Sequence, residues 1–200
     1  MGGQVSYAPV FEKFSPEKTV SLSEACEAAL RVSDNRAANF VLSLTGGPEK
    51  LTAWLRKWGD HVTRVDDYEP EINAFPEGKA GEERNSTTPL SAVELWRRLD
   101  REMEATARVR WLQAMVGGEV SGTLLRALLP ENWQVYDRTG AGAGTRALHA
   151  RVVSPEGEVY YLAAHVDAFK DRDLSLERRD ELLRMLLQEA VKVMEERAAR

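Results

Sequence analysis

The sequence has one cysteine, no long apolar run and no excess of positive charge, and each shortage excludes a class of protein. Cys26 alone cannot form an internal disulfide, and it leaves no cysteine set for a structural zinc ion. The three histidines, His61, His149 and His165, lie far apart without the spacing of a helical metal-binding pair. We therefore expect no metal and no cofactor.

Membrane spanning and nucleic-acid binding are also excluded. No stretch approaches the ~18 consecutive apolar residues of a membrane span. The first residues lack the charged and apolar regions of a signal peptide, so the chain as it stands is expected to be cytoplasmic. The 27 Lys and Arg residues are outnumbered by 32 Asp and Glu residues, and binding to phosphates requires the opposite balance.

The hydrophobic pattern predicts helices first and strands afterwards. The content of 43% hydrophobic residues is sufficient for one domain with a sizeable core. Helical spacing predicts helices over residues 21–32, 35–45, 49–58, 91–104 and 106–115, with a shorter helical piece over 124–129. A period of two then predicts strands over 134–138, 146–153 and 158–166, and a long amphipathic helix covers 175–198.

We therefore expect an α+β fold. Residues 1–132 would form a mostly helical lobe, and residues 133–200 would form three antiparallel strands covered by the C-terminal helix, integrated as one domain. Between residues 61 and 88 the periodicity is lost. A connection of this length is uncommon in a compact domain and is usually functional or disordered.

Three short motifs carry candidate chemistry. The Ser-Asp-Asn motif is weak when taken alone, since this tripeptide is an ordinary turn and helix N-cap sequence. In chain order the three motifs are Ser33-Asp34-Asn35, Glu69-Pro70-Glu71-Ile72-Asn73 and Arg138-Thr139-Gly140.

Together and in this order, the motifs resemble the signature of the class A serine β-lactamases, which combine Ser-x-x-Lys with Ser-Asp-Asn and Lys-Thr-Gly. The segments at Tyr7-Ala-Pro-Val, Gly46-Gly47-Pro48, 58–64 and Thr87-Thr88-Pro89 are also similar to that family. The resemblance implies a β-lactamase/transpeptidase-like fold, an omega loop at about 64–88, a β-lactam substrate, and export from the cytoplasm.

The resemblance also implies roles for residues of the first two motifs. Ser33 would relay a proton to the departing ring nitrogen, and Asn35 would hydrogen-bond the substrate's side-chain amide. Glu69 would be the general base that activates the deacylating water, with Asn73 helping to hold that water. Tyr7 would lie at the rim of the site.

The third motif implies a site for the substrate carboxylate. Arg138 stands where the family usually has Lys, and its cation would still attract that carboxylate. Thr139 would touch the same group, and the Ala141 backbone N–H would be one of two oxyanion donors. Arg146, on the next strand, would be a further carboxylate anchor.

The family's Ser-x-x-Lys element, which supplies the nucleophile, precedes the Tyr7 segment, and only six residues do so here. The string Ser15-Pro16-Glu17-Lys18 has the spacing but opens no apolar helix, so Ser15 is not expected to be the nucleophile. Two of the family's strands also come from the absent region. The strand over 158–166 would therefore be an open sheet edge, and Cys26 would lack the disulfide partner of several relatives.

The omega loop departs from the family pattern as well. The Arg–Asp pair that often closes its neck corresponds here to Asp67 and Asn85, and extra residues lie around 77–81. A lost ion pair predicts a poorly held Glu69.

Two readings of function stay open. In the first, the chain is part of a serine β-lactamase and does not turn over alone. In the second, it is a shortened, non-catalytic relative that binds a β-lactam, a peptidoglycan-like ligand or a protein partner without turnover. The partners expected at the open sheet edge are the missing N-terminal segment, a second copy or another chain. A penicillin-binding or peptidase relative is disfavoured because Glu69 and Asn73 fit a deacylating site.

Overall fold

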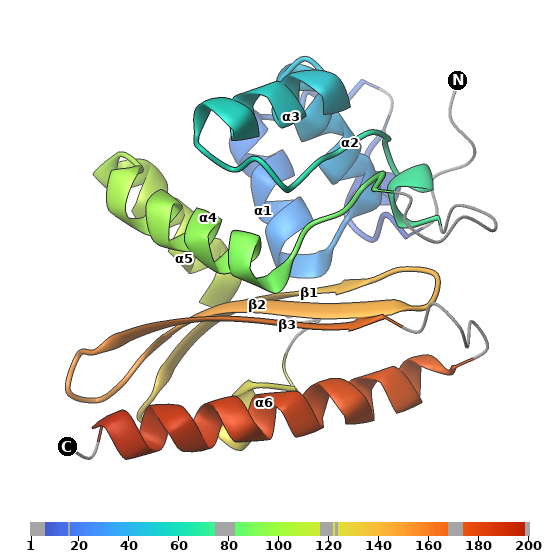
Figure 1. Ribbon diagram of the computed structural model, residues 1–200. Helices are drawn as coiled ribbons and strands as arrows, with labels where there is room; N and C mark the ends of the chain where they lie inside the picture. Colours follow the sequence, from blue (N-terminus) through green and yellow to red (C-terminus); the bar gives the residue numbers. More distant parts are fainter. Residues whose placement is uncertain are drawn as a thin grey trace. The chain divides into compact units, whose positions relative to one another are not determined.

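The computed structural model describes residues 7–15, 17–74, 83–116, 122, 124–167 and 174–198 (Figure 1). The chain forms two compact units, Met1–Ser91 and Ala92–Arg200. Helix α4 (Pro89–Glu102) falls mostly in the second unit, and α5 (Ala105–Val116) falls wholly in it. Both helices contact the strands of that unit.

The first unit is built from three helices, each with a start that its sequence explains. Helix α1 (Leu22–Val32) begins with a capping box, in which the side chains of Ser21 and Glu24 bond each other's backbone N–H. Helix α2 (Asn35–Leu44) is capped by Asp34, and α3 (Pro48–Lys57) has proline in its first turn. Two 3₁₀ turns, η1 (Phe11–Lys13) and η2 (Glu71–Asn73), lie in the connections of this unit.

The second unit is a three-stranded antiparallel sheet with helices on its two faces. The strands are β1 (Gln134–Ala141), β2 (Thr145–Val153) and β3 (Val159–Asp167), in the order β1-β2-β3. Helix α6 (Leu176–Ala198) covers one face, as Figure 1 shows. On the other face, Arg151 of β2 donates to Asp100 of α4.

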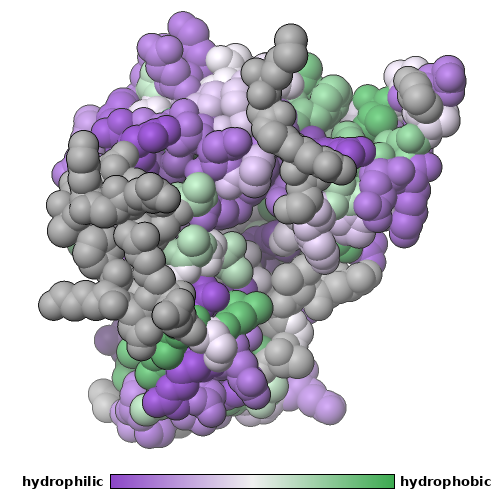
Figure 2. Space-filling view, turned by 90° about the vertical axis from the view of Figure 1, so that its right-hand side faces the viewer, coloured by the Kyte–Doolittle hydropathy of each residue, from purple (hydrophilic) through white to green (hydrophobic). Residues whose placement is uncertain are grey.

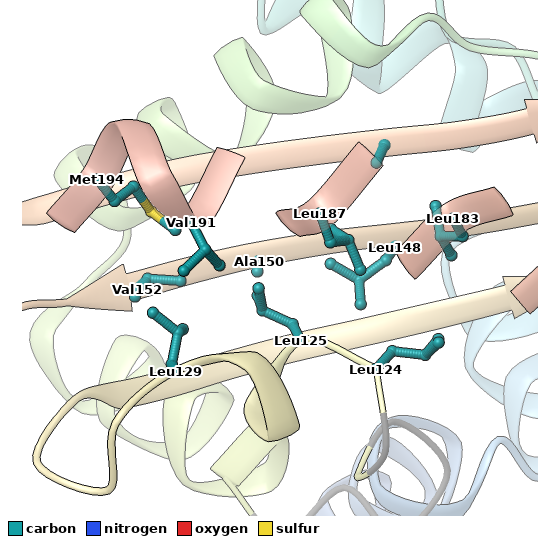
Figure 3. Close-up of a cluster of buried hydrophobic side chains, with 11 residues drawn as sticks. Leu124, Leu125, Leu129, Leu148, Ala150, Val152, Leu183, Leu187, Val191 and Met194 are labelled. Carbon is teal, nitrogen blue, oxygen red and sulfur yellow. The ribbon is translucent and has the colours of Figure 1, made fainter. Parts of the chain in front are cut away.

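The α6 face of the sheet holds the main hydrophobic core. Alternate residues of β2 (Leu148, Ala150 and Val152) face α6, as the period of a strand requires. They meet the helical stripe Leu183, Leu187, Val191 and Met194, and Figure 3 shows these side chains pointing toward one another. Leu124, Leu125 and Leu129, beside the short turn η3 (Arg126–Leu128), complete the cluster.

The expected α+β fold is confirmed, with corrections to two elements. Strand β1 extends to Ala141, since Thr139, Gly140 and Ala141 pair with β2. The helical piece predicted over 124–129 is only the 3₁₀ turn η3. Leu176 and Leu186 of α6 are exposed, because the helical period turns them away from the sheet.

Hydrophilic residues predominate on the face of the molecule in Figure 2, and hydrophobic residues form small patches between them. Among the helices of the described ranges, none combines the length and the apolar character that a membrane crossing requires.

Candidate active site

The Ser-Asp-Asn motif is organised by its central residue. The Asp34 side chain has no solvent exposure, and its Oδ1 accepts the N–H of Ala37 at 2.9 Å. Its Oδ2 accepts the N–H groups of Val10 and Phe11, each at 2.9 Å. One buried carboxylate therefore caps α2 and fixes the segment that carries Tyr7. The sequence marked the tripeptide as an N-cap signal without saying which residue forms the cap, and in the structure that residue is Asp34.

The backbone then brings Tyr7, Ser33 and Asn35 together. The Asn35 N–H donates to the Tyr7 carbonyl at 3.1 Å. Ser33 ends α1 in the left-handed conformation, with φ of 57°, and Tyr7 has φ of 61°. Non-glycine residues rarely adopt such angles, and they persist where the surroundings impose them. The Tyr7 side chain is 58% exposed.

Glu69 and Asn73 lie one turn apart and contact each other directly. The Asn73 amide nitrogen lies 2.8 Å from both carboxylate oxygens of Glu69. Burial raises the pKa of Glu69, the Asn73 hydrogen bond opposes the rise, and the charge of Glu71 adds to it. The result is a carboxylate with a raised pKa, held by an amide donor, which suits a group that exchanges protons.

The main chain of Glu69 is fixed by a residue that the sequence did not reveal. The Asn39 side chain accepts the Glu69 N–H at 2.8 Å and donates to the Glu69 carbonyl at 2.9 Å. Asn39 lies four residues after Asn35, so both are on the same side of α2. The i, i+4 spacing of Asn35 and Asn39 was the feature of the sequence that could have indicated a role for Asn39. One helix thus supports both motifs of the first unit.

The neck of the loop is closed, so the expectation that it loses its ion pair is wrong. The Asn85 side chain accepts the N–H groups of Asp66 and Asp67 and donates to the Asp67 carboxylate at 2.7 Å. Arg84 supplies the cation, 2.6 Å from the same carboxylate. Arg84, the neighbour of Asn85, therefore forms with Asp67 the ion pair that the sequence predicted to be lost. Residues 77–81, where the sequence suggested extra length, lie outside the described residues.

The surroundings of Ser15 do not suit a nucleophile. Ser15 is exposed and precedes no helix, and its carbonyl accepts the Lys18 N–H at 3.0 Å. The Lys18 ammonium lies 3.6 Å from Glu24 and 3.6 Å from the centre of the Phe14 ring. The lysine is thus engaged by a carboxylate and an aromatic face.

In the second unit, Arg138 follows a buried acidic residue on β1. Asp137 has no exposure, and its Oδ1 accepts two N–H groups of Arg126 at 2.9 and 2.6 Å. Burial raises the pKa of Asp137, and Arg126 opposes the rise. Burial also lowers the pKa of the Arg138 guanidinium, while Asp137 opposes the change. This acidic neighbour favours the charged form of a partly buried cation.

Thr139, Ala141 and Arg146 are brought together by the β1–β2 hairpin. Ala141 pairs with Arg146 in the register, and Arg146 Nη1 donates to the Gly140 carbonyl at 3.3 Å. The Thr139 hydroxyl oxygen is buried and accepts no hydrogen bond from the described residues. Arg146 is 7% exposed and forms an ion pair of 2.5 Å with Asp180 of α6. Asp180 therefore sets the direction of the Arg146 guanidinium, a role that the sequence did not suggest.

The candidate residues fall into one group in each unit. The first unit holds Tyr7, Ser33, Asn35, Glu69 and Asn73, and the second holds Arg138, Thr139, Ala141 and Arg146. Within the described ranges, no three His, Cys, Asp or Glu residues gather in a way that could hold a metal ion.

Comparisons with known proteins point to one family. A family model described as "Beta-lactamase enzyme family" matches residues 3–192. The chain is 40% identical over 176 residues to the β-lactamase CARB-4 of Pseudomonas aeruginosa, covering 84% of this chain and 60% of that protein. It is 37% identical over 169 residues to the β-lactamase AER-1 of Aeromonas hydrophila, covering 83% of this chain and 55% of that protein.

Solved structures agree in fold. The chromosome-encoded β-lactamase of Vibrio parahaemolyticus matches with a TM-score of 0.86 and 36% identity, over 95% of this chain and 71% of that one. An ancestral class A β-lactamase matches with a TM-score of 0.85 and 33% identity, over 94% and 71%. The chain spans 60% of the length of CARB-4 and 55% of the length of AER-1, the two curated relatives named above.

Proposed function

We propose, since this chain belongs to the β-lactamase enzyme family, that it carries the deacylation and substrate-carboxylate groups of a class A serine hydrolase. The substrate is a β-lactam, and its ring is opened through an acyl-enzyme. The observation that carries the proposal is the Glu69–Asn73 pair, with both carboxylate oxygens 2.8 Å from one amide nitrogen.

Glu69 acts as the general base of deacylation. A carboxylate with a raised pKa takes a proton from water and returns it within one cycle. Asn39 holds the Glu69 backbone and Asn73 holds its side chain, so the base needs little reorganisation. Ser33 relays a proton to the leaving nitrogen, Asn35 binds the substrate amide, and Tyr7 forms the rim.

The second group binds the substrate's carboxylate and its developing oxyanion. Arg138 and Arg146 supply positive charge, and the Thr139 hydroxyl, which has no described partner, donates a hydrogen bond. The Ala141 N–H is one oxyanion donor. The Asp180 ion pair limits how freely Arg146 can turn toward a substrate.

The nucleophile is not Ser15 and comes from a Ser-x-x-Lys segment outside residues 1–200. The chain alone is therefore expected not to hydrolyse a chromogenic cephalosporin. Hydrolysis by the chain alone that disappears with Ser15→Ala would contradict this part of the proposal.

The experiment begins with the intact mass of the protein from its own source. If that mass exceeds the 22.4 kDa of this chain by several kDa, the native protein is assayed with the cephalosporin. Glu69→Ala should then stop turnover and leave a covalent acyl-enzyme visible in the mass spectrum. Glu71→Ala, which removes the exposed carboxylate two residues away, is the matched control and should keep turnover. Hydrolysis that persists in Glu69→Ala would refute the role of Glu69.

A second candidate, a binding module, is favoured by the position of β3. This strand pairs only with β2 among the described strands and lies at an edge of the sheet. An edge strand can pair with a strand from another polypeptide, here the missing segment or a second copy. A native mass equal to that of this chain, together with a dimer in sedimentation velocity, would support the second copy. A monomer at every concentration would exclude it.

A further inference from the structure

Outside the candidate site, two histidines meet between strands β2 and β3. The Nε2 atoms of His149 and His165 are 2.8 Å apart. His165 pairs in the register with Ala147, two residues before His149, so the histidines lie diagonally on one face of the sheet. The family resemblance and the proposed function assign no role to this pair.

The ring positions define how the two imidazoles interact. Their centroids are 5.1 Å apart. With the Nε2 atoms at 2.8 Å, this separation requires the two rings to point head to head along nearly one line. One Nε2 therefore donates its hydrogen to the other, so the rings are opposite tautomers.

The same geometry argues against a shared metal ion. An ion on the line between two nitrogens, with bonds of 2.0–2.1 Å to each, needs a nitrogen separation of about 4 Å. A bent site would require both rings to turn away from the observed line. The pair is therefore a hydrogen bond and not a chelate.

Aromatic rings of the helical layer cover the pair. The Trp96 ring of α4 meets the His149 ring edge-on, at 6.2 Å and 88°. Trp96 also contacts Trp111 of α5 at 5.2 Å. The packing of α4 and α5 therefore depends on where the His149 ring lies.

The described carboxylates on this face form no hydrogen bond with the pair. Arg138 of β1 is the register partner of His149, and Arg151 follows two residues later on β2. Asp100 of α4 accepts from Arg151 and from Tyr161 of β3, and its backbone carbonyl accepts from Arg108 of α5. Asp167, two residues after His165 on β3, is an exposed carboxylate with no hydrogen bond to either ring. None of these groups therefore forms an ion pair with a doubly protonated pair.

We propose that His149 and His165 form an acid-sensitive clasp between β2 and β3. The clasp holds the two strands together when the pair is neutral or carries one added proton, and it opens when both imidazoles are charged. With one added proton, the bond becomes an imidazolium–imidazole hydrogen bond, which is stronger than the neutral one. With two, both rings are donors, neither accepts, and like charges lie in contact. The strands must then separate locally, and Trp96 loses its contact.

The pKa values agree with two separate steps. Burial lowers the pKa of His165. Burial and the neighbouring His165 charge together lower the pKa of His149 to about 4. The clasp therefore opens only in strongly acidic solution.

The test is an NMR titration of the whole chain with ¹⁵N-labelled histidine. At neutral pH one ring should be the Nε2–H tautomer and the other the Nδ1–H tautomer. On acidification both rings should report two separate protonation steps, and the near-ultraviolet circular dichroism of the tryptophans should change with the second step only.

His165→Phe supplies the matched perturbation, with His61→Gln as the control that leaves the pair intact. In His165→Phe, His149 should titrate in one step. Two Nδ1–H tautomers in the unsubstituted chain, or independent one-step curves for both rings, would overturn the clasp. Equimolar Zn²⁺ that shifts the resonances of both rings would also overturn it, because that result identifies a metal site. All of these readouts are independent of β-lactam binding.

Discussion

Replacement of Asp34 by alanine tests whether this carboxylate holds the Ser-Asp-Asn segment together. Asp34 is fully buried and accepts three backbone N–H groups, from Val10, Phe11 and Ala37. Asp34→Ala removes all three acceptors at once. The start of α2 loses its cap, and the segment after Tyr7 loses the side-chain acceptor of its Val10 and Phe11 N–H groups.

The magnitude follows from the three contacts. Loss of an N-cap costs about 1 kcal/mol, and each N–H left without a partner costs about 1.5 kcal/mol. We therefore expect Asp34→Ala to lower the free energy of unfolding by about 4 kcal/mol, close to a thousandfold in the unfolding constant. Asp34→Asn keeps one carbonyl oxygen and should lose about half as much.

Urea unfolding measures the total loss in the free energy of unfolding. Hydrogen exchange tests whether the amides of Val10, Phe11 and Ala37 lose their protection. Glu27→Ala is the control, since Glu27 is an exposed carboxylate whose ion pair with Arg31 contributes little. A loss below about 1 kcal/mol in Asp34→Ala would refute the reasoning. Unchanged exchange at the three amides would refute it too.

Three further predictions concern the partly buried residues Asn39, Arg126 and His149. Asn39→Ala should cost about 1–2 kcal/mol in urea unfolding and speed hydrogen exchange at the Glu69 amide, which loses its acceptor. Arg126→Leu leaves the buried Asp137 carboxylate unpaired and should cost about 3–5 kcal/mol, measured in the same way. The folded-state pKa of His149, about 4, lies below the ordinary 6.5, so the unfolded state binds more protons between these values. The free energy of unfolding should fall by up to about 3 kcal/mol as the pH decreases from 6.5 to 4, and His149→Leu should remove this part of the pH dependence.

Much of the fold could be predicted because its elements have strong periodicity. The alternation of Leu148, Ala150 and Val152 defined β2, and the Leu183 and Leu187 spacing defined the buried face of α6. Strand β1 was predicted too short, since Gly140 and Ala141 have weak strand propensity and are held by pairing with β2. Tertiary pairing, which is invisible in a local window, determined that boundary.

The supporting residues of the site could not be predicted in the same way. Asn39 and Asp180 act across 30 and 34 residues of sequence, on Glu69 and Arg146 respectively. A motif names the residue that performs chemistry, but a single sequence gives no measure of which distant side chain will orient it. Asp34 differs, because its N-cap role is local and could have been assigned from its position before α2.

The closed loop neck shows why the substitutions at Asp67 and Asn85 do not release Glu69. The neck needs a group that joins two chain segments, and an amide does so as well as an ion pair when it both accepts and donates. Asn85 accepts two N–H groups and donates to Asp67, whose charge is balanced by Arg84. Since exposed ion pairs contribute little and hydrogen bonds to backbone groups fix geometry, the amide is the more important closure. Asn85→Ala should therefore speed hydrogen exchange at the Asp66 and Asp67 amides more than Arg84→Ala does, and the reverse order would show that charge closes the neck.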